Sequence, residues 1–353
     1  MTTAPETQGE RGTAREALHR ARALVDPALR EWVGRLPAPV SRVASYHFGW
    51  TDSAGRPDDA PAGKALRPAL VLGCAEAVGG SAEAALVPAV AVELVHNFSL
   101  LHDDILDGDT TRRHRATAWT VFGSSAALLA GDALLIHASR VLADRPVWPR
   151  TDTGIRWLSE AATLLIEGEQ TDLSFEERSH VTLVESLAMT ERKTAALLSC
   201  SCALGSLWGG GSPDQTEELR RFGLHLGMAF QLADDLLGIW GDPSVTGKPA
   251  GADLSSRKKS LPVVAALDSG TAAGSRLAEL YGRPEPPEDA QARAEEVALL
   301  AALVAEAGGR SWAEEMAEEQ LGRALSCLRA ASPEGPAAAR LAALARFAVR
   351  RDR

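Results

Sequence analysis

Apolar residues recur along most of this chain at intervals of three and four positions, the spacing that places them on one face of a helix. Period-two alternation of β-branched residues, which would indicate strands, is scarce. The pattern therefore predicts an all-α fold, with a short helix inside a loop over residues 37–62. Helices are expected over residues 14–36 (divided at Asp26–Pro27), 63–78, 119–142, 153–170, 183–208, 217–240, 260–267, 290–307, 311–331 and 337–350, and another begins after Ser81.

No linker in the sequence has to separate two hydrophobic cores. Residues 1–13 are polar and are predicted to form a disordered tail. Residues 14–353 are predicted to form a single helical domain, because 353 residues with 45% hydrophobic content are ample for one sizeable core.

The helix after Ser81 contains a narrow polar stripe. His96, Ser99 and Asp107 fall within roughly 40° of Asp103 on a helical wheel, amid apolar neighbours. Asp103 and Asp107 are stacked about 6 Å apart, and two like charges so placed repel unless a cation neutralises them. Mg²⁺ often takes one or two carboxylates together with substrate phosphates, and Arg112–Arg113 follow at once as candidate phosphate ligands. A solvated helix face is the plainer alternative, whereas a calcium loop would need alternate ligands and a closing Glu that are absent.

A second acidic pair interrupts the apolar face of the helix expected over residues 217–240. Asp234 and Asp235 lie near its end, and the loop over residues 241–262 is rich in glycine and ends in lysines. That composition is typical of a mobile cover over an anionic ligand, although an ordinary surface loop would also fit. Two acidic pairs, each followed by basic residues, together indicate a phosphorylated ligand held through a metal ion.

Composition and charge restrict the partners and the compartment. A formal net charge of −10 argues against nucleic acid or an anionic membrane surface as the main partner. The four cysteines lack metal-site spacing, which favours a reducing compartment. The apolar run over residues 84–101 is broken by Glu93, His96 and Asn97, so no transmembrane helix is expected. With no apolar signal core at the N-terminus, a cytoplasmic protein is predicted.

The known sequence signatures of other chemistries are missing. No nucleophile elbow, Walker loop or dinucleotide fingerprint occurs in the sequence. The sequence therefore predicts an enzyme whose substrate is ionised, or gives up a group, with a metal-bound phosphate driving the reaction.

At these motifs the chain resembles the trans-isoprenyl diphosphate (polyprenyl) synthases. The resemblance rests on Asp103–Asp104–Ile105–Leu106–Asp107 with Arg112–Arg113, and on Asp234–Asp235 far downstream. It runs from about residue 63 to residue 262. It also includes Gly63–Lys64, Arg67–Pro68, His96, Gly131–Asp132, Gln170, Lys193–Thr194, Phe230–Gln231, Gly247–Lys248 and Lys258 before Ser260–Leu261–Pro262.

The resemblance implies a single all-α bundle of the isoprenoid synthase type around a deep central cavity, and a homodimer. It also implies head-to-tail condensation of isopentenyl diphosphate with an allylic diphosphate, using three Mg²⁺ ions or Mn²⁺ in their place. Asp103 and Asp107 would bind two of the ions and Asp234 the third, and Asp104 would act with them as a catalytic residue. The allylic diphosphate would be held by Arg112, Lys193 and Lys258; isopentenyl diphosphate by Lys64, Arg67, His96 and Arg113; and further substrate contacts would come from Thr194, Gln231 and Lys248.

Two positions bear on activity and on product length. Gly238 stands where the family has the last Asp of its second motif, and Asp242 could compensate only if the helix continues. Phe98 and Ser99 lie five and four residues before the first motif, where the family places the residues that limit chain growth. One aromatic residue without an insertion resembles the enzymes that make twenty-carbon geranylgeranyl diphosphate. On an ideal wheel, however, Phe98 lies about 140° from Asp103, so Phe98 could be plain core.

Two other functions remain in competition. A class I terpene cyclase also uses an aspartate-rich motif with Mg²⁺, but it would leave Lys64, Arg67 and Arg113 unexplained. A non-catalytic subunit of a prenyl synthase is indicated by Gly238 alone. Taken singly, His96 could be a core histidine and Lys193 a solvated surface residue.

Overall fold

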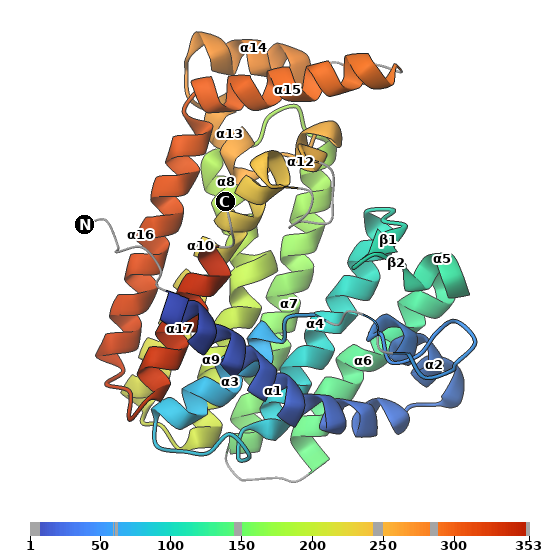
Figure 1. The fold of residues 1–353 in the computed structure, drawn as a ribbon, viewed down its shortest axis with the longest axis vertical. Coiled ribbons are helices and arrows are strands. Elements are labelled where there is room, and N and C mark those ends of the chain that lie inside the picture. The colour runs from blue at the N-terminus through green and yellow to red at the C-terminus, as the bar shows by residue number, and fades with distance from the viewer. Residues whose placement is uncertain are drawn as a thin grey trace.

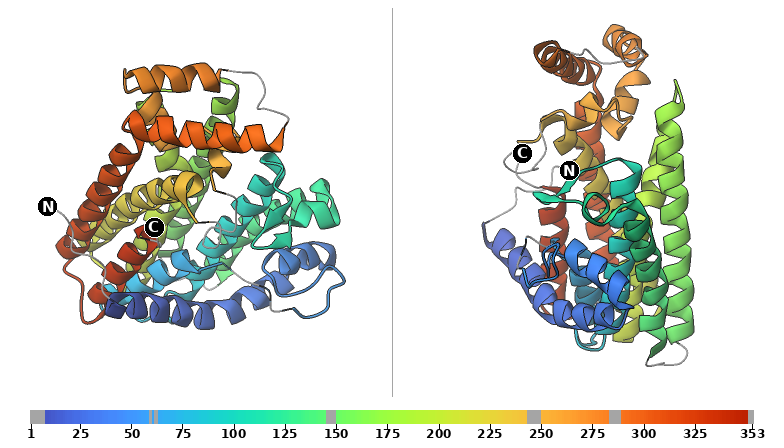
Figure 2. Two further views of the ribbon diagram at one scale, coloured as in Figure 1. Left: turned by 45° about the horizontal axis from the view of Figure 1, so that its top comes forward. Right: turned by 90° about the vertical axis from the view of Figure 1, so that its right-hand side faces the viewer.

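A computed structural model describes residues 8–58, 60, 63–144, 150–242, 250–282 and 289–350, and it is almost entirely helical. Figures 1 and 2 show long helices running side by side, with α14 and α15 crossing one end of the molecule. The elements are α1 (Gln8–Gly34), α2 (Ala38–His47), α3 (Leu66–Ala77), α4 (Leu86–Leu106), β1 (Thr111–Arg112), β2 (Arg115–Ala116), α5 (Ala118–Phe122), α6 (Ser124–Asp144), α7 (Arg150–Glu177), α8 (Leu183–Thr190), η1 (Glu191–Ala195), α9 (Ala196–Gly209), α10 (Pro213–Trp240), α12 (Ala252–Ser255), α13 (Leu261–Leu267), α14 (Ala272–Tyr281), α15 (Ala290–Glu306), α16 (Gly309–Ala330) and α17 (Ala337–Val349).

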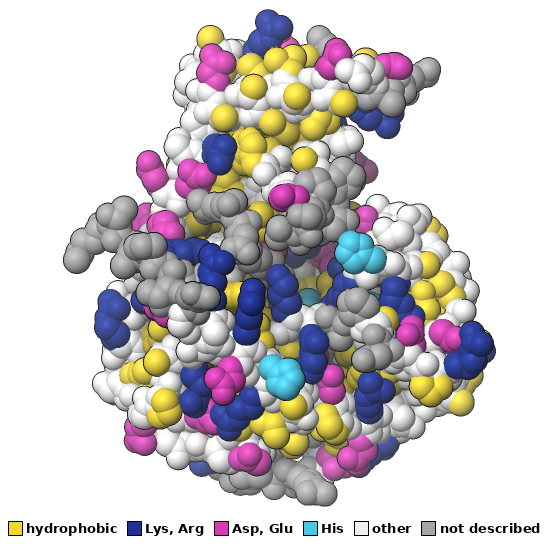
Figure 3. Space-filling view, in the orientation of Figure 1, with side chains coloured by type: hydrophobic (Ala, Val, Ile, Leu, Met, Phe, Trp, Pro, Cys, Tyr) yellow, Lys and Arg dark blue, Asp and Glu magenta, His cyan; other side chains and the backbone are white. Residues whose placement is uncertain are grey.

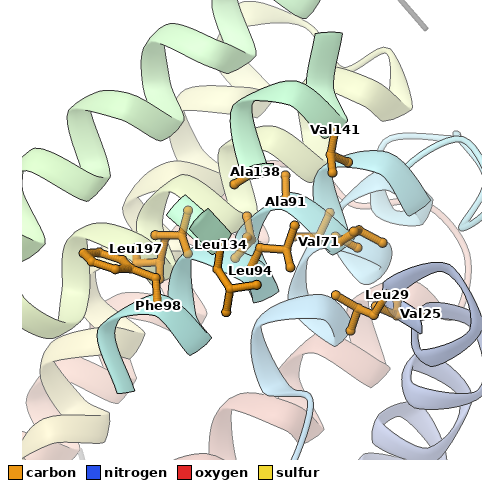
Figure 4. Close-up of a cluster of buried hydrophobic side chains, with 14 of the residues drawn as sticks. Val25, Leu29, Val71, Ala91, Leu94, Phe98, Leu134, Ala138, Val141 and Leu197 are labelled. Atoms are coloured by element: carbon orange, nitrogen blue, oxygen red, sulfur yellow. The ribbon is translucent and has the colours of Figure 1, made fainter. Parts of the chain in front are cut away.

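Two apolar clusters surround the helices that carry the acidic motifs. Helix α4 packs against α3, α6 and α9, and Figure 4 shows its Leu94 and Phe98 among side chains such as Leu134 and Leu197. Helix α10 packs against α9 and α16 through a second cluster that includes Phe222 and Leu226. Both motif helices are therefore fixed by burial along most of their length, which holds their ends in place.

The predicted all-α class is confirmed, but several boundaries differ. Helix α1 begins at Gln8, so the predicted disorder is wrong for residues 8–13; residues 1–7 lie outside the described part. Pro27 does not divide this helix, because the buried stripe Ala21, Val25, Leu29 and Val33 runs straight past it.

Three further features were not predicted. Gly123, with φ 85°, ends α5 and separates it from α6, so residues 119–142 are not one helix. Helix α14 lies in a stretch that was given no element. Strands β1 and β2 form a short hairpin in the basic segment after the first acidic motif, where no strand was expected.

Helix α6 is the one helix among the described residues that is long and apolar enough to span a bilayer by length and composition. Its buried residues, including Ala127, Leu134 and Val141, pack against α4 in the core. Burial of this face accounts for part of that hydrophobicity, while Leu129 and Ile136 of the same helix are exposed.

Candidate active site

The two acidic clusters open onto one pocket of about 560 Å³. It lies among α4, α7, η1 and α10, and the segment from α12 to Leu261 closes one side. Figure 3 shows Lys and Arg side chains gathered across the middle of one face of the molecule, although the net charge is −10. The pocket is lined by acidic residues (Asp103, Asp107, Asp109, Asp172, Asp234, Asp235, Asp253), basic residues (Lys64, Arg112, Lys193, Lys258, Lys259) and others that include Leu100, Met189, Thr190, Thr194, Gln231, Leu237 and Gly238.

Neighbouring aspartates in the first cluster point in different directions. Asp103 and Asp107 line the pocket, whereas Asp104 is buried and accepts a hydrogen bond of 2.6 Å from Arg112 Nε. A helix turns about 100° per residue, which separates Asp104 from its neighbour. Asp104 was expected to act at the pocket with the other two carboxylates; instead it anchors the arginine of β1.

Asp103 is held in an environment that disfavours its charge. Burial, together with the nearby carboxylates of Glu169 and Asp107, raises the pKa of Asp103 to about 8, although Lys193 and Arg112 oppose that rise. A carboxylate in this state gains from a cation that enters the pocket.

Lys193 occupies a π-helical turn, a conformation often found at functional sites. Its Nζ lies 2.6 Å from Asp172 Oδ2 and 2.7 Å from Glu169 Oε2. Gly168 allows this approach, because a Cβ there would lie 2.7 Å from Lys193 Cα. Burial opposes the charge of Lys193, but the carboxylates of Asp172, Glu169 and Asp103 raise its pKa.

Gln170, named in the family resemblance, is exposed, and the preceding residue Glu169 is buried and pairs with Lys193 instead. The sequence held a signal for this orientation. Glu169 continues the buried stripe of Leu158, Ala162 and Leu165 on α7, whereas Gln170 is rotated about 100° away from it.

The second cluster differs from the first, because both of its aspartates border the pocket. Asp234 and Asp235 line it together. Asp235 is 4% exposed and accepts hydrogen bonds of 2.8 Å from Gln231 Nε2 and 2.9 Å from the Leu261 backbone N–H. Gln231 in turn accepts a 2.7 Å hydrogen bond from Thr194 Oγ1, so one chain of bonds ties η1, α10 and α13 together. Burial, with Asp253 adding to it, raises the pKa of Asp235 to about 6 against the opposing effect of Lys258.

The two lysines before α13 have separate roles. Lys259 donates a 2.6 Å hydrogen bond to the Phe175 carbonyl near the end of α7. Burial opposes the charge of Lys258, but Asp235 and Asp253 raise its pKa, so Lys258 stays cationic beside the pocket.

A second basic group lies beyond Arg112. The pKa of His96 is lowered well below its usual value by burial and by the charges of Arg67 and Arg113, which places these three predicted residues near one another. A Cβ on Gly63 would lie 2.6 Å from Arg113 Nη2, so the loop that carries Lys64 also passes close by. The predicted isopentenyl diphosphate ligands therefore gather in one region.

His47 belongs to this basic group and was not predicted. Its half-buried side chain lines a small pocket together with Arg112, Arg113 and Arg115, and the loss of solvent, followed by these charges, lowers its pKa to about 3. Among the described residues its Nε2 has no hydrogen-bond partner. The sequence offered no signal, because His47 lies more than fifty positions from the motif it contacts.

The hairpin holds its arginines with strained backbone. Arg113 and His114 have φ of 52° and 63°, as a two-residue turn of type I′ requires, although neither is glycine. Tyr46 Oη donates a 2.8 Å hydrogen bond to the Ala116 carbonyl and thereby fixes the hairpin to α2. Such strain persists only where the surroundings impose it, and it concentrates at functional sites.

Asp242 does not line the pocket, and Lys248 lies outside the described residues. Asp242 follows the end of α10, because Gly241 is extended (φ −70°, ψ 149°), and it lines a separate small pocket with Trp240 and Arg310. The expectation that Asp242 could compensate for Gly238 is therefore wrong.

The all-α fold and the two carboxylate clusters, each beside basic residues, define an enzyme of the isoprenoid diphosphate class. The polyprenyl synthetase family model matches residues 59–298, so the chain belongs to the polyprenyl synthetase family and is a prenyltransferase. It is 44% identical to a (2E,6E)-farnesyl diphosphate synthase of Mycobacterium tuberculosis over 99% of this chain and 97% of that one. It is also 42% identical to a geranylgeranyl diphosphate synthase of the same species, over 95% and 93%. The crystal structure of a polyprenyl synthetase from Streptomyces coelicolor A3(2) has a TM-score of 0.90 and 46% identity, covering 95% of this chain and 99% of that one.

The family uses Mg²⁺ to bind diphosphate, and the donor set of this pocket fits that ion. No three His, Cys, Asp or Glu side chains in the described part of the chain are grouped closely enough to hold a metal alone. Carboxylates of Asp103, Asp107 and Asp234 nevertheless line one pocket with Lys193 and Lys258. Mg²⁺ commonly combines one or two carboxylates with waters and substrate phosphates, so bound diphosphate would complete its coordination.

Proposed function

We propose that this prenyltransferase joins isopentenyl diphosphate to dimethylallyl, geranyl or farnesyl diphosphate and releases geranylgeranyl diphosphate as its main product. The site supports this assignment through two basic groups: Arg112, Lys193 and Lys258, which line the pocket, and Arg67 and Arg113, whose charges act on His96. Two diphosphates need two such groups.

The chemistry follows from where the charges lie. The allylic C–O bond breaks and its electron pair leaves with diphosphate, after which the isopentenyl double bond attacks the allylic carbon and a proton passes to the released diphosphate. Arg112, Lys193 and Lys258 neutralise the charge that develops on the leaving group, an effect worth several kcal/mol in a water-poor site. Bound Mg²⁺, proposed as three ions at Asp103, Asp107 and Asp234, supplies further Lewis-acid stabilisation.

The position of Phe98 is the observation that supports the proposed length of the prenyl product. Phe98 lies 4% exposed on α4, between one and two turns before Asp103, and Figure 4 shows its ring beside Leu197 of α9. Its ring also packs edge-on against His102, with centroids 4.8 Å apart. We infer that Phe98 closes the space into which the growing prenyl chain extends.

The Phe98→Ala variant should therefore shift the products to longer prenyl diphosphates, as measured by chromatography of dephosphorylated products. Phe222→Ala is the matched control, because this buried phenylalanine lies on α10 in the other apolar cluster. Equal product lengths in wild type and Phe98→Ala would refute the role of Phe98. A main product of fifteen carbons in the wild type would instead favour farnesyl diphosphate, the product that the 44%-identical relative is named for.

The same purified protein tests the rival functions. With Mg²⁺, labelled isopentenyl diphosphate and each allylic primer, the proposal predicts a longer diphosphate. Hydrocarbon released from farnesyl diphosphate alone would indicate a terpene cyclase, and no product from any primer would indicate a non-catalytic subunit.

We further propose that the protein acts as a cytoplasmic homodimer and that residues 14–353 fold as one domain. Support for the dimer comes from exposed apolar side chains on α6, namely Leu129 (60% exposed) and Ile136 (73% exposed). Analytical ultracentrifugation of wild type and Ile136→Glu tests this interface, since the charge should produce monomers.

A further inference from the structure

Lys258 stands between two side chains that are tied to different helices. On one side, Arg257 Nη2 lies 2.9 Å from Glu296 Oε1 of α15. On the other side, Lys259 Nζ donates a 2.6 Å hydrogen bond to the Phe175 carbonyl of α7. Lys258 itself lines the pocket. Both neighbours of this lysine in the chain are therefore anchored, one to α15 and one to α7.

Arg257 occupies a backbone position that favours glycine. Its φ is 56°, in the left-handed region. The Arg257 N–H donates a 3.1 Å hydrogen bond to the Leu254 carbonyl, and the Lys258 N–H donates one of 2.8 Å to the Asp253 carbonyl. These two bonds are the pattern of a Schellman motif, which usually has glycine at the left-handed residue. A side chain at this position costs conformational energy, so its contacts have to stabilise the turn.

The Arg257 side chain has such contacts on both α14 and α15. It is 17% exposed, and the Glu296 side chain with which it pairs is 10% exposed. An ion pair partly withdrawn from water interacts more strongly than one on an open surface. The Arg257 Cζ also lies 5.4 Å from the centre of the Tyr281 ring, at the end of α14. Tyr281 Oη in turn donates a 3.4 Å hydrogen bond to the Lys258 carbonyl.

An apolar cluster seats the whole segment on the α14–α15 pair. Leu254 of α12 and Val263 of α13 share this cluster with Leu300 of α15. Gly251, just before α12, packs so closely that a Cβ there would collide with Val297 of α15. Figure 1 shows α14 and α15 crossing the end of the molecule next to α12 and α13. None of the described residues that line the pocket belongs to α14 or α15, so this pair can affect the site only through the segment that it holds.

We infer that the α14–α15 pair is a positioning element for the active site, and that Arg257 is the positioning residue through which it sets the place of Lys258. Arg257 contacts Glu296 and Tyr281 rather than the pocket, and the left-handed turn at Arg257 directs the next side chain towards the pocket. The inference rests on the proposed role of Lys258 in holding a diphosphate.

The first test is a double-mutant cycle on the binding of inorganic pyrophosphate with Mg²⁺, measured by calorimetry on the full chain. Arg257→Gln and Glu296→Gln should each raise the Kd by about tenfold, because each breaks the same ion pair from one side. Lys258→Ala should also weaken binding. Adding Arg257→Gln to Lys258→Ala should change the Kd by less than about twofold, since Arg257 then has no lysine to position.

Two further variants complete this measurement. Arg257→Lys keeps a cation for Glu296 and should bind pyrophosphate within about threefold of wild type. Arg350→Gln is the matched control and should leave binding unchanged, because Arg350 makes an ion pair of the same 2.9 Å length with Glu318, is 16% exposed, and does not line the pocket.

Arg257→Gly separates positioning from stability. Glycine adopts a φ of 56° without strain, which offsets the loss of the ion pair. This variant should therefore unfold at a urea concentration close to that of wild type and still bind pyrophosphate as weakly as Arg257→Gln. A residue with a purely structural role would not lose binding at unchanged stability.

Hydrogen exchange of the peptide over residues 251–260, without any ligand, measures the restraint itself. Arg257→Gln should speed exchange in this peptide and leave α4 unchanged. Unchanged exchange would overturn the inference. So would an unchanged Kd in Arg257→Gln, or an equal loss of binding with and without Lys258, because Arg257 would then act independently of that lysine.

The exchange measurement also keeps the inference distinct from the proposed function. A wild type that binds no pyrophosphate, or a Lys258→Ala variant that binds it as tightly as wild type, would count against the proposed function. Exchange alone then decides whether Arg257 places the segment: faster exchange in Arg257→Gln supports that role, and equal exchange overturns it.

Discussion

The two acidic clusters bring carboxylates to the pocket from different numbers of chain segments. In the first, α4 alone supplies Asp103 and Asp107 to the pocket. In the second, α10 supplies Asp234 but has Gly238 one turn later, and the next segment brings Asp253 into the vacated volume. The position of a carboxylate in space, rather than its register in a motif, decides what it can bind.

The clusters agree in how they use their adjacent aspartates. In each pair the second residue is buried and accepts hydrogen bonds: Asp104 from Arg112, and Asp235, which also borders the pocket, from the Leu261 backbone N–H at the start of α13. Each of these buried aspartates thereby fixes the basic segment that follows its helix. Adjacent aspartates in one motif thus combine a carboxylate at the pocket with an anchor for nearby cationic side chains.

The largest effect should come from removing a carboxylate that faces the pocket. Asp103→Asn should lower kcat by roughly 10²–10³-fold, because charge stabilisation at the leaving diphosphate is lost. The variant should unfold in urea at no lower a concentration than wild type, since the charge of Asp103 is disfavoured in the folded protein. A large drop in the urea midpoint would mean that Asp103 is an anchor as well.

The anchors should show the opposite behaviour in the same urea measurement. Asp104→Ala and Asp235→Ala should each cost about 1–3 kcal/mol of the free energy of unfolding, because each leaves buried donors without an acceptor. Asp235→Asn is the matched control: its amide oxygen can still accept from the Leu261 N–H, so most of that stability should remain. Equal losses for the alanine and asparagine variants would contradict the hydrogen-bond account.

His47 should make stability depend on pH with a definite sign. Its folded pKa is about 3, below that of an unfolded histidine, so the unfolded chain binds a proton that the folded protein does not. The stability that His47 contributes is present above pH of about 6.5 and is lost as the pH falls, by about 1.4 kcal/mol per pH unit.

Urea unfolding of wild type and His47→Gln at several pH values between pH 6.5 and pH 4 measures this term. His96 faces the same arginines and adds a slope of the same sign, so the difference between the two proteins isolates His47. The exposed His180 provides the control variant His180→Gln. Parallel pH profiles for wild type and His47→Gln would contradict the burial of a neutral His47.

Periodicity and motif spacing were enough to predict the helical class and much of the pocket. Asp103, Asp107, Asp234, Lys193 and Lys258 all line it, since each lies on or beside a long helix whose apolar face is strongly specified. The rotation of Asp104 away from the pocket also follows from helical geometry once Asp103 is placed.

The remaining features depend on contacts between distant segments. Asp253 lies next to Gly238 although it is fifteen positions later and on another helix. His47, at the end of α2, lies close to Arg113 in the turn between β1 and β2. Neither of these contacts produces a periodic pattern in the sequence from which it could be predicted. Helix α1 continues through Pro27 because tertiary packing outweighs a local preference, which a local reading of Asp26–Pro27 does not detect.

The most direct test of the whole account is condensation by wild type, Asp103→Asn and Asp234→Asn side by side. Each is incubated with Mg²⁺, labelled isopentenyl diphosphate and farnesyl diphosphate, and the products are separated by chain length. The account predicts labelled geranylgeranyl diphosphate from the wild type and at least about a hundredfold less from each variant. Product formation that survives both substitutions, or a wild type that forms no labelled prenyl product, would contradict it.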